Sequence, residues 1–181
     1  MNAFVTFSTL IRWWSTSIFF LVAVALPASA QVLQSQRYEI PMHSFERDFE
    51  IIPADTSGLY LYRKIYSGTD DQLHIIKLDT AFHEEWSGFL PIEKNYLLMG
   101  KRCFEDKLYL LLRYHDYSRN DLLLFVINHS DGNYTRYTVK SFIPFAPSEF
   151  QLTSKAALIG GYYNRVPVVM HFSFATFKSK V

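Results

Sequence analysis

The chain has 181 residues and a formal net charge of +1, and aromatic residues make up 17% of it. With only seven glycines and seven prolines, this composition is typical of a chain with a packed core, and it excludes a largely disordered protein. The nearly neutral charge balance argues against a nucleic-acid-binding protein, which needs a basic face, and against an electrostatic binder of membrane surfaces.

Residues 1–30 are predicted to be an export signal. Arg12 supplies the only charge, an apolar run covers residues 18–26, and Ala28-Ser29-Ala30 fits the small-x-small rule for cleavage. The apolar run is shorter than the ~20 residues of a membrane-spanning helix. We therefore expect cleavage and export to the periplasm or outside the cell, with no stable membrane span afterwards. An uncleaved N-terminal anchor is the alternative. Without these residues the chain carries 17 basic and 17 acidic side chains.

Apolar strands recur with a period of 49 residues. The first strand of each unit stands at residues 59–62, 108–111 and 157–160, and a second apolar run follows each of them, at 73–78, 122–127 and 167–172. Residues 108–112 and 122–127 do not alternate between apolar and polar side chains, which is typical of a sheet that is covered on both faces. A period of this length fits the four-stranded blade of a β-propeller and is too long for a leucine-rich or β-helical repeat.

The sequence therefore predicts an all-β fold of antiparallel β-propeller-like repeats, with a β-sandwich or small barrel as the alternative. After a lead-in segment at 31–47, the repeat domain covers 48–181, in units of roughly 48–93, 94–141 and 142–181. We expect about three blades, the last incomplete. Since propellers have 4–8 blades, we expect either a fragment of a longer propeller with C-terminal blades missing or a homodimer that closes one ring.

Within the units, turn signals separate the expected strands. In the first unit, a short strand at 49–53 precedes the hairpin, and a polar stretch with Phe82 and Trp86 follows it as far as Gly88. In the second unit, Asp131-Gly132 is typical of a hairpin turn and leads into a fourth strand at 134–139. Residues 142–147, with two prolines, are predicted to link the second and third units.

Two short motifs resemble kelch-type propeller repeats. Residues 158–162, Leu-Ile-Gly-Gly-Tyr, look like the strand with a double glycine, and Leu78-Asp79 ahead of Trp86 resembles the second half of that repeat. The two halves stand in different units here, and the slots equivalent to the double glycine hold Tyr62-Arg63 and Leu111-Leu112. The resemblance implies a propeller scaffold and no particular activity.

Residues with catalytic or metal-binding potential form no recognisable motif. The six histidines lack tight zinc-ligand spacing. His83-Glu84-Glu85 is the densest polar cluster, and we expect a solvated loop there in preference to a metal site. Cys103 is expected to be a small buried residue in preference to a nucleophile. No metal or other cofactor is expected.

Tyrosines recur in or just after the first hairpin strand of the units. We expect most of them to pack between blades. Those near the strand ends, Tyr66, Tyr114 and Tyr163, are candidates for an exposed rim that stacks on sugar rings or peptide side chains, because tyrosine has an apolar body and a polar tip.

The functional prediction is an exported, non-enzymatic binding or interaction protein whose partner is a protein or a carbohydrate. The alternative is a carbohydrate-active or other hydrolytic propeller. Hydrolysis of that kind needs two carboxyl groups that face each other across a site. Glu85, Glu93 and Asp106 are the candidates for such a pair.

Overall fold

The structure of the protein is a computed structural model, and it describes residues 36–42, 48–66, 68–116 and 119–181. The expected export signal at 1–30 and the lead-in residues 31–35 and 43–47 lie outside the described residues. Among the residues that are described, no helix has both the length and the apolar character needed to cross a membrane.

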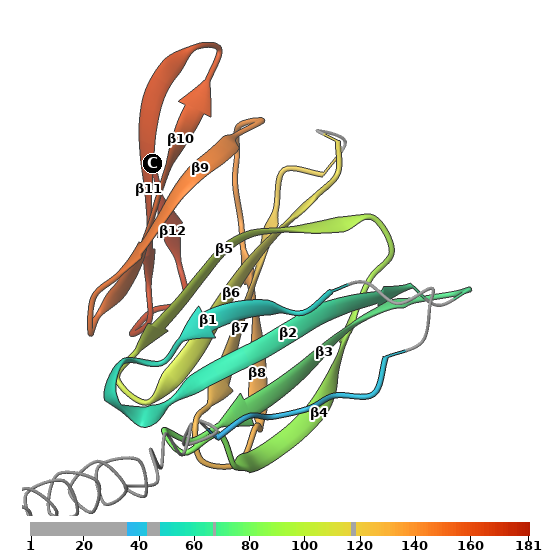
Figure 1. The fold of residues 1–181 in the computed structure, drawn as a ribbon. Helices are drawn as coiled ribbons and strands as arrows, with labels where there is room; N and C mark the ends of the chain where they lie inside the picture. The colour runs from blue at the N-terminus through green and yellow to red at the C-terminus, as the bar shows by residue number, and fades with distance from the viewer. Residues whose placement is uncertain (1–35, 43–47, 67, 117–118) are drawn as a thin grey trace, which may run out of the picture. The chain divides into compact units, whose positions relative to one another are not determined.

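The described chain is all-β and antiparallel, as predicted (Figure 1). Its strands form three sheets of four, and each sheet uses strands that are consecutive in the sequence. The first sheet has the order β1 (Glu50–Pro53), β2 (Leu59–Tyr66), β3 (Asp71–Leu78), β4 (Glu84–Ile92). The second has the order β5 (Tyr96–Phe104), β6 (Lys107–Tyr114), β7 (Leu122–Asn128), β8 (Tyr134–Val139). The third has the order β12 (Ser179–Lys180), β11 (Val166–Ser173), β10 (Ala156–Tyr163), β9 (Ala146–Leu152). A 3-10 helix, η1 (Asp55–Ser57), lies between β1 and β2.

The predicted hairpins are confirmed. In the first sheet β2 pairs with β3, and in the second sheet β6 pairs with β7, so that Leu108 lies opposite Ile127. The fourth strand expected at residues 134–139 is β8. Gly132 has a positive φ of 70° in the turn before it, where the amide of Asn128 donates to the carbonyl of Asn133 at 2.8 Å. This turn needs a left-handed residue, which glycine adopts without strain.

The expectation that the last unit is incomplete was wrong, because β12 adds a fourth strand to the third sheet. In the β11–β12 pair, Phe172 lies opposite Ser179. The intervening turn is closed by the amide of Ser173, which donates to the carbonyl of Lys178 at 3.0 Å. A strand of two residues is too short to show an apolar period, so β12 could not be predicted from the sequence.

The polar stretch after β3 was also misread, because residues 84–92 form β4 and not a loop. Leu90 and Ile92 point into the core, while Phe89 and Pro91, which alternate with them, are exposed. An edge strand with one wet face carries alternating polar residues. Its first residues, Glu84 and Glu85, therefore resemble a solvated loop when only composition is considered.

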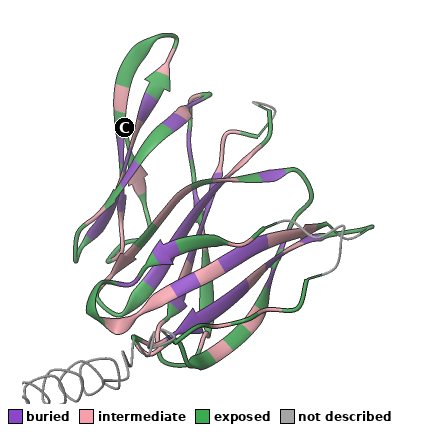
Figure 2. Cartoon of the chain, in the orientation of Figure 1, coloured by how far each residue is buried: buried purple, intermediate pink, exposed green. Residues whose placement is uncertain are grey.

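Two apolar cores join the three sheets, and buried segments run through all of them (Figure 2). Alternate residues of β6 point into different cores. Leu108, Leu110 and Leu112 pack against the first sheet, whereas Tyr109 and Leu111 pack against the third. The second sheet is thus covered on both faces, as its non-alternating strands predicted.

The first strands of the three sheets lie near one another. Strand β1 approaches β5, and β5 approaches β9. The approach is closest at Gly100, where an added Cβ would lie 2.6 Å from the Cβ of Phe150. These three strands stand at sheet edges, and the space beside them is the place where the structure offers a cleft.

Candidate functional site

A cleft of about 530 Å³ opens beside the first strands of all three sheets. Its lining mixes charged side chains of both signs with aromatic and apolar ones. The lining includes Asp48, Glu50, Tyr62, Arg63, Lys64, Tyr66, Leu97, Met99, Lys101, Arg102, Glu149 and Phe150. A cleft of this size and mixed character suits a polar ligand of moderate size.

Glu50, Tyr62 and Lys101 form a hydrogen-bonded triad in the wall of this cleft. The hydroxyl of Tyr62 donates to Oε2 of Glu50 at 2.5 Å. Nζ of Lys101 donates to the same oxygen at 2.8 Å and to the Tyr62 hydroxyl at 2.9 Å. The pairing of β1 with β2 places Glu50 opposite Tyr62, and β5 brings Lys101 from the second sheet. The triad therefore links the first two sheets where they meet the cleft.

The triad keeps its charges near neutral pH. Hydrogen bonds from Lys101 and then from Tyr62 lower the pKa of Glu50. Burial raises the pKa of Tyr62, and its hydrogen bond to Glu50 raises it further. Burial draws the pKa of Lys101 down, but its bonds to Glu50 and Tyr62 outweigh this, so that pKa lies above its ordinary value. A carboxylate and an ammonium that are fixed in this way are better suited to binding than to proton transfer near pH 7.

The triad keeps hydrogen-bonding capacity for a ligand. An ammonium group has three N–H donors, and Lys101 uses two of them within the triad. Both bonds to Glu50 converge on Oε2, so Oε1 can accept a bond from a ligand. Groups that donate and accept at once, such as a sugar hydroxyl or a peptide amide, match this pair.

A β-bulge places apolar surface beside the triad. In the β5–β6 pair, Leu98 lies opposite Leu112 and Gly100 lies opposite Leu111, so Met99 is an extra residue. Bulges re-aim side chains and are common beside binding sites. Met99 and Leu97 line the cleft and are partly exposed, which gives a ligand apolar contacts next to the charged ones.

Of the three tyrosines predicted for binding, Tyr66 lines this cleft. It is 56% exposed, and Nζ of Lys64 lies 5.0 Å from its ring centroid. Tyr114 is half-buried, because its ring packs edge-on against Tyr96 with centroids 5.4 Å apart. Tyr163 is half-buried at the end of β10. Neither of these two lines the cleft.

The carboxylates considered for hydrolysis lie outside the cleft lining. Glu85 forms an ion pair with Lys77 at 3.1 Å, and Glu93 forms one with Arg119 at 2.8 Å. Asp106 lies in the turn between β5 and β6, with a positive φ of 56°. Glu50 and Lys101 were not predicted from the sequence as site residues, because they lie in separate units and belong to no motif.

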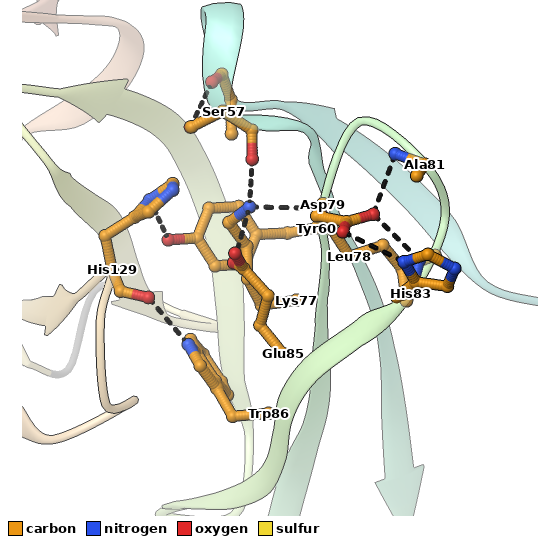
Figure 3. Close-up of polar contacts among 11 residues, drawn as sticks. Ser57, Tyr60, Lys77, Leu78, Asp79, Ala81, His83, Glu85, Trp86 and His129 are labelled. Atoms are coloured by element: carbon orange, nitrogen blue, oxygen red, sulfur yellow. Dashed lines mark hydrogen bonds and ion pairs between the residues drawn. The ribbon is translucent and has the colours of Figure 1, made fainter.

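A second polar cluster is centred on the fully buried Lys77 of the first sheet (Figure 3). Its Nζ donates to the carbonyl of Leu78 at 2.9 Å and to that of Ser57, and it pairs with the carboxylate of Glu85. The same nitrogen lies 5.5 Å from the ring centroid of Tyr60. Backbone acceptors, a carboxylate and an aromatic ring thus compensate for the burial of this ammonium group.

His129, from the turn after β7, completes this second cluster. Its Nδ1 lies 2.7 Å from the hydroxyl of Tyr60, and its carbonyl accepts a hydrogen bond from the indole nitrogen of Trp86 at 2.7 Å (Figure 3). Burial raises the pKa of the half-buried Cys103 to about 11, so its thiol stays protonated. These contacts run from sheet to sheet, and the cluster therefore holds the fold together.

The cluster predicts a pH dependence of stability. Burial, followed by the charge of Lys77, lowers the pKa of His129 below its ordinary value of 6.5. Glu85 and Asp106 oppose the shift, and Nε2 of the ring is buried without a hydrogen-bond partner among the described residues. The unfolded chain therefore binds a proton that the folded chain excludes, and stability falls as the pH drops below 6.5.

Urea midpoints at pH 7 and pH 5 measure this effect in the wild type and in His129→Gln. We expect the wild type to lose more stability than the variant over this interval. Equal losses would mean that other groups carry the pH dependence. The lowered carboxyl pKa values, such as that of Glu50, act at more acidic pH and do not interfere in this window.

Among the described residues, no group of three or more His, Cys, Asp or Glu side chains could hold a metal ion. His83, in the polar cluster noted in the sequence, lies 3.2 Å from a carboxylate oxygen of Asp79.

No protein-family model, curated protein or solved structure matches the chain. We therefore infer the function of the protein from the cleft and its triad.

Proposed function

We propose that the protein is an exported, non-enzymatic binding protein of the β-propeller type. The observation that carries the proposal is the Glu50–Tyr62–Lys101 triad, which lines a cleft between sheets and has one donor and one acceptor oxygen left for a ligand. The ligand is a polar one that presents hydroxyl or amide groups, either a carbohydrate or a segment of a protein.

The arrangement of the sheets supports the propeller component. Each sheet is a four-stranded antiparallel unit of consecutive strands, and each packs on the next through an apolar core. The second strands of the sheets begin at Leu59, Lys107 and Ala156, in line with the 49-residue period of the sequence. Blades of a propeller are units of this kind, placed around a common axis.

The ionisation state of Glu50 in the cleft wall favours binding over hydrolysis. A glycosidase needs one carboxyl group that is kept protonated as a general acid. Glu50 is instead held ionised by a cation and a hydroxyl.

The test is ligand binding measured by saturation-transfer NMR, with cellohexaose, chitohexaose and a pool of tetrapeptides as probes. We expect one class to bind and Lys101→Met to weaken that binding by about 10-fold or more, since a hydrogen bond to a charged group is lost. Lys107→Met removes an exposed lysine outside the cleft lining and serves as the matched control.

Three results would count against the proposal. If neither probe class bound, the cleft would lack the predicted ligand. If Lys101→Met bound as tightly as the control, the triad would not be the site. If the wild type cleaved the oligosaccharides, the hydrolytic alternative would replace binding.

A further inference from the structure

Each sheet has a forward face, which packs on the next sheet along the chain, and a reverse face, which packs on the previous one. Tyr60 and Tyr62 lie on the forward face of the first sheet, and Tyr109 and Leu111 lie on that of the second. Both of these forward faces are buried in the cores between sheets. The first sheet therefore packs on the second in the same way as the second packs on the third.

The forward face of the third sheet carries exposed apolar side chains among polar ones, such as Glu149 opposite Gly160 and His171 opposite Leu158. The side chains of β10 and β11 that contribute to the second core, such as Ile159 and Met170, are on the reverse face. Their neighbours, Tyr162 and Val169, are on the forward face and are 53% and 62% exposed. In the β10–β11 register, Val169 lies opposite Gly160, in the middle of that face.

The reverse face of the first sheet also carries exposed apolar side chains, while Ile76 and Leu78 on the same face are buried. Ile52 and Leu90 point forward into the first core, so Ile51 and Phe89 point backward. These two side chains are 59% and 58% exposed, and Phe89 stacks on the ring of His74 with centroids 4.6 Å apart. The chain thus exposes apolar side chains on one forward face and one reverse face. Each of its two cores joins a forward face to a reverse face.

We propose that the forward face of the third sheet packs on the reverse face of the first sheet of a second copy. Two such contacts, related by a two-fold axis, join two chains into one ring of sheets. The contact continues the forward-to-reverse packing that both cores already use, and six sheets fall within the 4–8 blades of known propellers. This inference goes beyond ligand binding, because it concerns surfaces outside the cleft.

The test is the solution mass of the full chain, measured by light scattering after size-exclusion chromatography. We expect twice the mass of one chain. Val169→Glu and Phe89→Glu should each yield monomers, with a dimer Kd raised by at least about 100-fold, because each contact would bury an unpaired carboxylate. Val166→Glu changes an exposed valine of β11 that points away from the forward face, and it should remain a dimer.

Mixing the two monomeric variants separates the proposed contact from other ways of pairing. In a mixed dimer, the third sheet of the Phe89→Glu chain meets the first sheet of the Val169→Glu chain with both surfaces unaltered. The second contact carries both glutamates and stays open, whereas a dimer of either variant alone has no unaltered contact. We therefore expect dimers to reappear on mixing. A monomeric wild type would overturn the proposal. A dimeric Phe89→Glu variant would also overturn it, since the third sheets would then be meeting each other. Far-UV circular dichroism checks folding, and Val169→Asn replaces a variant that fails to fold.

Discussion

Gly161→Ala is expected to destabilise the protein by about 3 kcal/mol. An added Cβ at this position would lie 2.1 Å from the carbonyl oxygen of Ala146 and 2.8 Å from Cζ of Phe145. Neither neighbour can give way easily, because Ala146 contributes backbone and Phe145 is 2% exposed in the second core. The register between β9 and β10 also shifts at this point. Overpacking must therefore displace a strand, and the change in the urea midpoint at constant m-value measures the cost.

Gly160→Ala is the matched control on the adjacent residue. Its Cβ would lie 3.2 Å from the Cβ of Glu149, whose exposed side chain can move. Glycine within a strand costs about 0.5–1 kcal/mol in backbone entropy relative to alanine, so the substitution is expected to be neutral or slightly stabilising. Equal destabilisation by both variants would contradict the steric explanation for Gly161.

The double glycine shows how far the sequence could be read. It marked residues 160 and 161 together as a kelch-like element, whereas the structure requires glycine for close approach mainly at 161. The all-β class and the hairpins were predictable, because β6 and β7 are apolar on both faces and turn residues bound them. Strands whose apolar residues do not alternate with polar ones are buried on both faces, and such burial can be predicted from composition.

The remaining features could not be predicted because they depend on contacts between sheets. Glu50 and Lys101 are 51 residues apart and share no local motif. The bulge at Met99 changes which way that side chain points without altering the apolar pattern around it. Strand β4 begins with the exposed Glu84 and Glu85, and this polar start concealed it. In each case tertiary geometry, and not local propensity, determines the role of the residue.

Lys77→Met is expected to lower the free energy of unfolding by about 3 kcal/mol. The ammonium group is fully buried and donates to the carbonyls of Ser57 and Leu78. Methionine fills a similar volume but donates nothing, so both acceptors lose their partner, at about 1–3 kcal/mol for each buried group left unsatisfied. Chemical denaturation of the wild type and the variant at pH 7 measures the difference.

Glu85→Gln separates the role of these backbone acceptors from that of the ion pair. The Glu85 side chain is 44% exposed, which weakens its ion pair with Lys77, and glutamine keeps a carbonyl oxygen that can accept from Nζ of Lys77. We therefore expect the substitution to cost at most about 1 kcal/mol. If Lys77→Met were as stable as the wild type, apolar packing would have compensated for the lost network, as it does in some buried ion pairs. If instead both variants were equally destabilised, the ion pair between β3 and β4 would be the main stabilising contact of Lys77, and the carbonyls of Ser57 and Leu78 would be secondary.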